Sequence, residues 1–205
     1  MIGPLEIAAN IFTALAIVLA GRNNVHTWWT GIVGCALFGA LFAQNRLYAD
    51  VALQAFFVAT GFYGWWKWLR GAHGKPLPIT HAIRAGILRT LAAGIAGTVA
   101  YGAMLYSTTD AYAPFTDSTV LVFSIIGQVL MMQRRVENWG FWLLVNTIAV
   151  PLYASRGLYL TAVLYAFFWI NAAVSWRSWR RLAAEAAVME GGAAVEAAPA
   201  PSAHQ

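Results

Sequence analysis

Apolar runs separated by short polar connectors follow one another along the chain. A helix that spans a bilayer needs about 20 apolar residues, with a range of roughly 17–25. We predict seven such helices, at 5–21, 27–44, 47–69, 83–106, 116–133, 137–154 and 158–180. The pattern therefore indicates an all-α membrane protein with seven transmembrane helices.

Proline and glycine mark the places where these helices should end or bend. The longest connector, near 70–82, holds Pro76 and Pro78, and Pro151 inside the sixth run predicts a kink. Beyond Ala183 the chain is rich in Ala, Gly, Glu and Pro, and we expect it to be disordered. Four residues there should stop any helix: Gly191, Gly192, Pro199 and Pro201.

The apolar region contains an internal duplication. Residues 25–70 align without gaps onto residues 136–181 at a constant offset of 111. The identical positions include rare aromatic residues: Trp28/Trp139, Tyr48/Tyr159, Trp65/Trp176 and Trp68/Trp179. A skewed Leu and Ala content is the alternative explanation of the matches, but it does not by itself align Trp and Tyr. Weakly similar halves in a hydrophobic chain are typical of secondary transporters.

The composition excludes a soluble domain. Of the 205 residues, 60% are hydrophobic and 10% are charged, whereas a soluble domain carries about 25% charged residues. The one cysteine, Cys35, lies in an apolar run, so no disulfide within the chain is possible. Residues 1–6 lack the basic start of a cleavable signal, and we expect the first helix to be retained.

Basic residues divide unequally between the two sides of the predicted bundle. With seven spans, 11 of the 13 Lys and Arg residues fall on one side, and Arg46 and Arg156 fall on the other. The 11 are Arg22, Lys67, Arg70, Lys75, Arg84, Arg89, Arg134, Arg135, Arg177, Arg180 and Arg181. Basic loops stay in the cytoplasm, so we expect the N-terminus outside and the C-terminus inside. Membrane orientation, rather than nucleic-acid binding, accounts for this charge.

The number of spans sets the symmetry of the duplication. Each repeat holds three helices, and the fourth helix restores the chain direction between them, which makes the repeats parallel as in SWEET-type sugar transporters. We therefore expect a 3+1+3 organisation. Its parts are a first three-helix repeat at 1–69, a cytoplasmic loop and linker helix at 70–110, a second three-helix repeat at 111–182, and a disordered cytoplasmic tail at 183–205.

Two indoles and a carboxamide share one face of the sixth predicted helix. Trp139, Trp142 and Asn146 lie at i, i+3 and i+7. Such a face suits a flat heteroaromatic ligand, and a cationic ring would gain about 0.5–2 kcal/mol of cation–π attraction. The alternatives are an interfacial anchor for Trp139 and a helix–helix hydrogen bond for Asn146.

The third and seventh predicted helices present matching polar faces. Asp50 and Gln54 correspond to Thr161 and Tyr165 in the duplication, and we expect these four residues to line one central path. Asp50 would attract a cationic substrate, or it is a solvated acid near a helix end. Asn171 either joins the site or bonds to a neighbouring helix. The conserved pairs are expected to form the scaffold, and the mismatched pairs to form the substrate site: Gly31/Trp142, Cys35/Asn146, Gln54/Tyr165 and Asp50/Thr161.

The sequence lacks the signatures of catalysis. It has no HExxH, GxSxG or phosphate-binding glycine motif. Its histidines have no metal-ligand spacing, and the last span contains no lysine that could bind retinal. We therefore expect no enzyme activity, no metal and no cofactor.

A motif in the sixth span resembles the PnuC family of vitamin transporters. It reads Val136-Glu137-Asn138-Trp139-x-x-Trp142-x-x-x-Asn146, and the first repeat agrees at Leu47-Tyr48-Ala49, Gln54-x-Phe56-Phe57 and Tyr63-Gly64-Trp65. The resemblance covers the chain to about residue 181. It implies a homotrimer in a bacterial inner membrane and facilitated diffusion without ATP or a required ion. A cytoplasmic kinase would then phosphorylate and trap the vitamin.

The resemblance also implies which residues contact the substrate, while leaving its identity open. By motif, these are Trp139, Trp142 and Asn146, followed by Gln54 and Asn171. Gly34 and Gly61 stand where nicotinamide riboside transporters carry Asn, which changes the polar groups expected in the site. Nicotinamide riboside and thiamine are therefore the first candidates, with riboflavin as the alternative. A receptor or scaffold that transports nothing is the alternative from another functional class. For a transporter, we expect the two repeats to rock around a site near the third, sixth and seventh helices.

Overall fold

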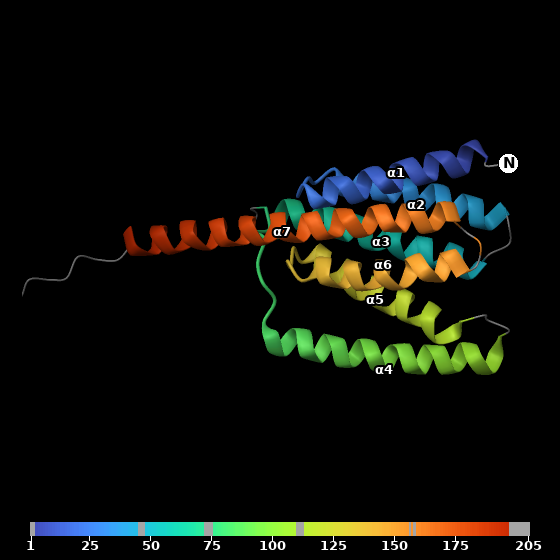
Figure 1. Cartoon of the computed structure of the whole chain (residues 1–205). Helices are drawn as coiled ribbons and strands as arrows, with labels where there is room; N and C mark the ends of the chain where they lie inside the picture. Colours follow the sequence, from blue (N-terminus) through green and yellow to red (C-terminus); the bar gives the residue numbers. More distant parts are fainter. Residues whose placement is uncertain are drawn as a thin grey trace, which may run out of the picture.

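Each apolar run of the sequence forms one helix (Figure 1). The computed structural model describes residues 3–44, 48–71, 76–109, 113–155, 157 and 159–196, without the side chains of 48–50, 52, 160 and 190–196. Its helices are α1 (Pro4–Gly21), α2 (Thr27–Gln44), α3 (Tyr48–Arg70), α4 (Arg84–Thr108), α5 (Pro114–Met132), α6 (Asn138–Ser155) and α7 (Tyr159–Glu196). These bounds agree with the predicted runs to within a few residues, except at the end of α7.

The last helix is longer than predicted. The segment expected to be disordered from Ala183 is helical as far as Glu196, and α7 continues through Gly191 and Gly192. The prediction that these two glycines end the helix is therefore wrong. The segment is rich in Ala and Glu, which are strong helix formers, and it contains no proline before Pro199. Residues 197–205 lie outside the described residues.

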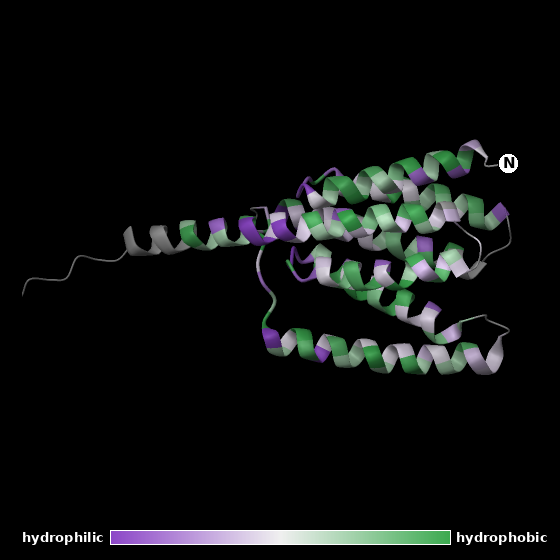
Figure 2. Cartoon of the chain, viewed as in Figure 1, coloured by the Kyte–Doolittle hydropathy of each residue, from purple (hydrophilic) through white to green (hydrophobic). Residues whose placement is uncertain are grey.

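Four helices of the described chain, α1, α2, α4 and α5, are long and apolar enough to cross a membrane. The sixth helix has the same length as α2 but carries Asn138 and Asn146. Large apolar side chains also lie exposed on the outside of the bundle, such as Leu88 and Val174. Figure 2 shows hydrophobic residues along the bundled helices and hydrophilic residues where α7 leaves the bundle. A surface of this kind suits lipid rather than water.

The helices pack in two groups of three. Within the groups α2 packs against α1 and α3, and α6 packs against α5 and α7. The groups meet where α1 contacts α7 and where α3 contacts α5. Among the described residues, α4 packs against α5 alone, and Figure 1 shows it at the edge of the bundle. The two contacts between the groups are equivalent: if α1, α2 and α3 are exchanged for α5, α6 and α7, the α1–α7 contact becomes the α5–α3 contact.

The connections after α1 and α5 have the same backbone conformation. Asn23 and Arg134 both have positive φ angles, of 53° and 52°, a region that residues other than glycine seldom adopt. The next amide in each connection bonds five residues back, from Asn24 to the Leu19 carbonyl (2.9 Å) and from Arg135 to the Leu130 carbonyl (3.0 Å). In each case the two residues are separated by the same offset of 111, although they precede the aligned segments. The offset read from the sequence therefore also holds for the backbone at these two corners.

Candidate functional site

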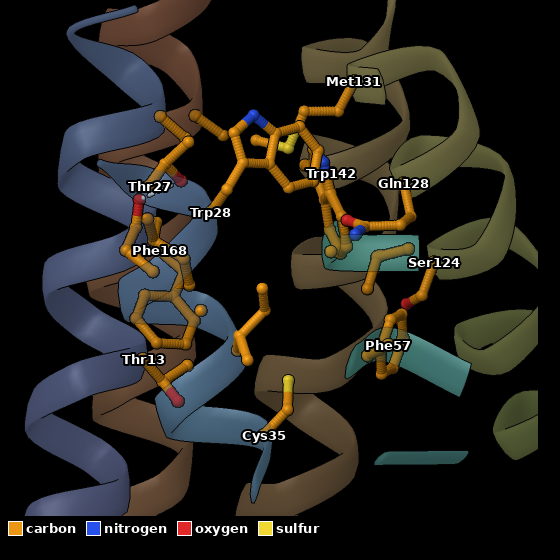
Figure 3. Close-up of a pocket in the computed structure, with 18 of the residues that line it drawn as sticks. Thr13, Thr27, Trp28, Cys35, Phe57, Ser124, Gln128, Met131, Trp142 and Phe168 are labelled. Carbon is orange, nitrogen blue, oxygen red and sulfur yellow. Dashed lines mark hydrogen bonds between the residues drawn. The ribbon is translucent and has the colours of Figure 1, made fainter. Parts of the chain in front are cut away.

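A cavity of about 310 Å³ lies between the two groups of helices (Figure 3). Its lining comes from α1, α2 and α3 on one side and from α5, α6 and α7 on the other. Most lining residues form pairs that are related by the offset of the duplication: Thr13/Ser124, Ile17/Gln128, Ala20/Met131, Trp28/Trp139, Gly31/Trp142, Cys35/Asn146, Gln54/Tyr165, Phe57/Phe168 and Gly61/Ala172. The cavity therefore takes corresponding residues from both halves of the chain.

The two walls of this cavity differ in chemistry. Where the first half offers Gly31, Cys35 and Ile17, the second half offers Trp142, Asn146 and Gln128. The second wall is thus more aromatic and richer in hydrogen-bonding groups. Three of the four mismatched pairs expected at the site have both members in the lining. The fourth, Asp50/Thr161, does not: the Asp50 side chain lies outside the described residues, and Thr161 is absent from the lining.

Several polar groups of the lining have no partner among the described residues. The indole N–H groups of Trp28, Trp139 and Trp142 are buried without an acceptor. Within the described part of the chain, no hydrogen bond is formed by the carboxamides of Asn146 and Gln128. Leaving a buried donor or acceptor unpaired costs about 1–3 kcal/mol. A ligand that combines an aromatic ring with hydrogen-bonding groups would satisfy this lining.

Glycines allow two of the indoles to lie close to neighbouring helices. A Cβ atom added at Gly127 would lie 3.1 Å from Cε2 of Trp142, and one added at Gly64 would lie 2.4 Å from Cη2 of Trp28. Both distances are shorter than ordinary contacts between a side chain and a Cβ atom, so any larger residue would displace the ring. The absence of a side chain at these positions is what permits the close approach.

Other residues predicted for the site have different surroundings. The Nδ2 atom of Asn171 donates to the Ile17 carbonyl at 3.1 Å, so this carboxamide joins α7 to α1 and does not line the cavity. The counterpart of Asn171 in the duplication, Thr60, was not predicted as a site residue and bonds within its own helix, to the Phe56 carbonyl at 2.9 Å. A Cβ atom added at Gly34 would lie 2.7 Å from Oγ1 of Thr13. Gly34 therefore packs against α1, and of the two glycines expected in the site only Gly61 lines the cavity.

Residues on α1, α2 and α5 line the cavity without having been predicted from the sequence. Trp28, Thr13, Ser124 and Gln128 all line the cavity, and none was predicted as a site residue. The offset of the duplication could have found Trp28 as the counterpart of Trp139. The spacing of Ser124 and Gln128, at positions i and i+4, could have indicated a shared polar face on α5.

Four buried tryptophans form a cluster beside the cavity. Trp28 lines the cavity and makes an edge-to-face contact with Trp68, at a centroid distance of 5.2 Å. Trp139 also lines the cavity and makes the same kind of contact with Trp179, at 5.5 Å. Trp68 and Trp179 also contact each other, at 5.8 Å. We call these four residues the tryptophan cluster. None of the four is more than 4% exposed.

Two indole N–H groups of the tryptophan cluster join the two groups of helices. The N–H of Trp68 donates to the Met131 carbonyl at 3.0 Å, and that of Trp179 is shared between the Ala20 and Gly21 carbonyls, each at 3.2 Å. The two donors are counterparts in the duplication, and the acceptors Ala20 and Met131 are related by the same offset of 111. The end of α3 is therefore fixed to α5, and the corresponding part of α7 is fixed to α1.

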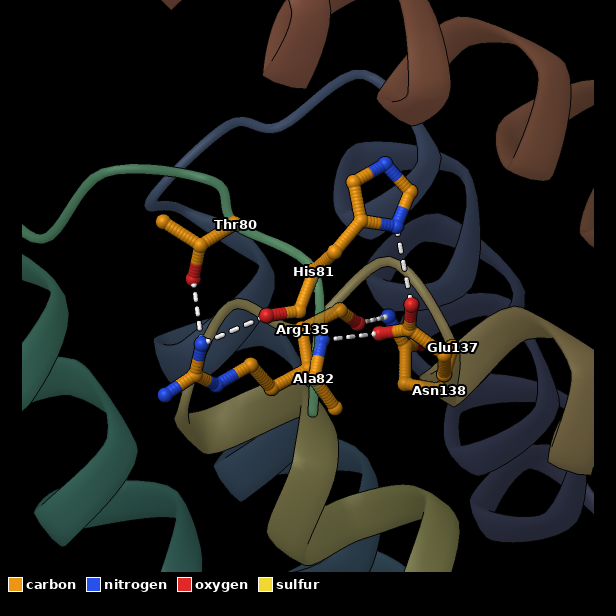
Figure 4. Close-up of polar contacts among 6 residues, drawn as sticks. All are labelled: Thr80, His81, Ala82, Arg135, Glu137 and Asn138. Atoms are coloured by element: carbon orange, nitrogen blue, oxygen red, sulfur yellow. Dashed lines mark hydrogen bonds and ion pairs between the residues drawn. The ribbon is translucent and has the colours of Figure 1, made fainter. Parts of the chain in front are cut away.

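The segment before α4 binds the corner between α5 and α6 (Figure 4). Arg135 donates from Nη1 to the Thr80 hydroxyl (2.8 Å) and to the His81 carbonyl (2.9 Å). The Glu137 carboxylate accepts from the Ala82 amide (2.9 Å) and lies 2.8 Å from Nδ1 of His81. We call these contacts the latch. They hold the described part of the α3–α4 connection, from residue 76, against the second group of helices.

A buried arginine joins the latch to the tryptophan cluster. The guanidinium of Arg134 lies 4.2 Å from the centre of the Trp68 ring and donates to the Leu77 carbonyl. Burial lowers the pKa of Arg134 to about 10, so the side chain stays charged at neutral pH. The cation–π contact is therefore present under physiological conditions.

Comparison with known proteins places this architecture among transporters. A family model described as "Nicotinamide mononucleotide transporter" matches residues 3–181. The chain is 28% identical to the nicotinamide riboside transporter PnuC of Escherichia coli (strain K12) over 202 residues, covering 84% of each protein. It is 30% identical over 183 residues to the riboflavin/roseoflavin transporter RibM of Streptomyces davaonensis, covering 85% of this chain and 83% of RibM.

A solved structure has the same fold. It is described as "Crystal structure of the Vitamin B3 transporter PnuC", and the superposition gives a TM-score of 0.68 at 24% identity. The match covers 88% of this chain and 82% of that chain.

Proposed function

This chain belongs to the nicotinamide mononucleotide transporter family, whose members are membrane transporters rather than enzymes, and we propose that it carries a flat heteroaromatic vitamin by facilitated diffusion. Nicotinamide riboside is the first candidate substrate, and thiamine is the second. Riboflavin is the alternative within the same family, because RibM is as similar to this chain as PnuC is. A cytoplasmic kinase would trap the vitamin after entry.

The observation that carries this proposal is the lining of the cavity. Trp142 supplies a ring for stacking, while Asn146 and Gln128 supply unpaired carboxamides on the same wall. Vitamins of this class join a ring to a polar chain or sugar, so they match an aromatic surface beside free hydrogen-bonding groups. A receptor or scaffold that moves nothing would need no cavity with unpaired carboxamides between its halves.

The symmetry of the contacts supports a parallel 3+1+3 repeat. The corners at Asn23 and Arg134 and the hydrogen bonds of Trp68 and Trp179 all obey the offset of the duplication. We propose that the two groups of helices rock about an axis along the membrane normal. The tryptophan cluster is the closed end of the path, and its hydrogen bonds between the groups must break for that end to open.

We further propose that this closed end faces the cytoplasm of a bacterial cell. Three residues of the cluster lie at the start of α2, the start of α6 and the end of α3, which is the end of the bundle from which α7 extends (Figure 1). Hydrophilic residues gather at this end (Figure 2), and the loops and adjoining helix segments there hold most of the 13 basic residues. Basic loops remain on the cytoplasmic side of the inner membrane. The N-terminus would then lie outside. Assembly as a homotrimer, implied by the resemblance to the PnuC family, completes the proposal.

Uptake by purified protein in liposomes tests the function. We expect accumulation of labelled nicotinamide riboside, thiamine or riboflavin without ATP and without an ion gradient. Trp142→Ala should abolish uptake, because it removes the stacking surface, whereas Trp66→Ala should not, because Trp66 is 56% exposed on the outside of α3. If none of the three vitamins enters wild-type liposomes, the proposed substrate class is wrong.

A further inference from the structure

The counterpart of Trp142 in the first half of the chain is a glycine, and this leaves space at one place in the cavity. Gly31 is related to Trp142 by the offset of the duplication and lines the same cavity. A Cβ atom added at Gly31 would meet only the Ala16 Cβ, at 3.7 Å, which is an ordinary contact distance. The space beyond this glycine is therefore open.

The residue that packs behind position 31 is larger than the one behind position 142, which is the reverse of the difference between Gly31 and Trp142 themselves. Trp142 lies on Gly127, whereas Gly31 faces Ala16, and Ala16 and Gly127 are themselves counterparts at the same offset. The second half therefore places a large residue on a glycine, and the first half places two small residues together. The Trp142 indole fills a volume in the second half of the chain, and the corresponding volume beside Gly31 in the first half is part of the cavity.

The open space has an aromatic neighbour and a thiol on its own helix. Trp28, Gly31 and Cys35 lie at i, i+3 and i+7 on α2 and all line the cavity. This face matches Trp139, Trp142 and Asn146 on α6. We propose that the ring of the transported vitamin occupies the place where the duplication would put a tryptophan at position 31. Gly31 is thus the residue that sets which ring size is accepted.

This inference rests on the proposed transport function but makes a separate prediction about size. A one-ring vitamin fills less of this space than the three-ring system of riboflavin. A small side chain at position 31 should therefore weaken the binding of riboflavin, and only a larger side chain should also weaken the binding of vitamins with smaller rings. An ordinary packing role for Gly31 would predict loss of stability without any order among ligands.

Graded substitution at Gly31 tests the proposal through uptake and through ligand binding by tryptophan fluorescence. Gly31→Ala should weaken the binding of riboflavin more than the binding of nicotinamide riboside. Gly31→Trp should weaken the binding of both vitamins about 100-fold, since the indole would occupy the space proposed for the ligand ring. Gly86→Trp on α4 is the matched control, because nothing lies within 4 Å of a Cβ atom added there.

An exchange variant keeps the test decisive if Gly31→Trp alone folds poorly. Combining Ala16→Gly, Gly31→Trp and Trp142→Gly moves the indole to the other wall with its glycine behind it, and binding should return to within about 10-fold of wild type. Unchanged affinity in Gly31→Trp would overturn the inference, as would an equal loss of every ligand in Gly31→Ala. Absence of wild-type uptake would instead count against the transport function itself.

Discussion

At the scale of single residues, glycine decides where the aromatic rings of the cavity lie. Gly127 lets the Trp142 indole rest on α5, and the ring would otherwise project into the space for the ligand. Because the interior is close-packed, adding even one methyl group displaces the neighbouring side chains. The glycines behind the rings are therefore as important to the site as the rings themselves.

Gly127→Ala should weaken vitamin binding about 10-fold, because the added methyl group pushes Trp142 by a few tenths of an ångström. Titration of purified protein with the transported vitamin measures this change. Gly97→Ala is the control, since its Cβ atom would lie 3.5 Å from Val122, at an ordinary distance. Equal affinities for the two variants would show that Trp142 does not need its present position.

Two asparagines should respond differently to the same substitution. Asn146→Ala should reduce uptake about 10- to 100-fold with little change in thermal stability, because its carboxamide is free for a ligand. Asn171→Ala should lower the melting temperature with little change in affinity, because it breaks a bond between α7 and α1. Thermal melting and binding assays on both variants distinguish the two roles. The reverse result would exchange the two assignments.

At the scale of helices, the latch distinguishes the two halves. The corner after α5 holds the α3–α4 connection through Arg135 and Glu137. The corresponding residues after α1 are Asn24 and His26, whose hydrogen bonds within the described chain stay in their own corner and helix. Within the described chain, the second corner therefore forms side-chain hydrogen bonds to a distant segment, and the corresponding residues of the first corner do not.

Arg135→Ala should release the described end of the α3–α4 connection, because it removes both hydrogen bonds of its guanidinium. We expect faster tryptic cleavage at Arg84 and a changed uptake rate with unchanged affinity. Glu137→Gln should have a smaller effect, since the ion pair is partly exposed and such pairs contribute about 0–1 kcal/mol. Arg22→Ala, at an exposed residue of the first corner, is the control. Unaltered cleavage in Arg135→Ala would mean that the latch does not restrain the connection.

At the scale of the whole molecule, the native cysteine reports on the cavity. Cys35 is the single cysteine of the chain and lines the cavity wall, so alkylation needs no engineered site. A saturating concentration of the transported vitamin should slow labelling of Cys35 by a small maleimide. Labelling that is equally fast with and without every candidate vitamin would place the ligand elsewhere.

The tryptophan cluster should control access to that cysteine from one side. Trp68→Phe and Trp179→Phe each remove an indole N–H that bonds across the two groups of helices, and one such hydrogen bond contributes about 0.5–1.5 kcal/mol. We expect both variants to label several-fold faster from the side of the latch. Trp66→Phe, on the outside of α3, should label at the wild-type rate. No increase in either cluster variant would mean that this end is not the gate.

The sequence by itself determined the helices and the offset between the halves. Hydropathy along a helix is a local property, so the bounds of α1 to α6 could be predicted from the chain alone. The same holds for Trp139, Trp142 and Asn146, whose spacing places them on one face. The end of α7 was mispredicted because helix propensity in an alanine-rich run outweighed two glycines.

Only the tertiary structure decided which faces point into the cavity. Gly31 and Gly34 lie one helical turn apart, yet one borders open space and the other packs on Thr13. Asn146 and Asn171 are both polar groups in apolar helices, yet one is free and the other bonds to α1. Each helix has several faces, and the partner helix on each face is chosen by packing across the whole bundle. Spacing within one helix carries no information about that choice.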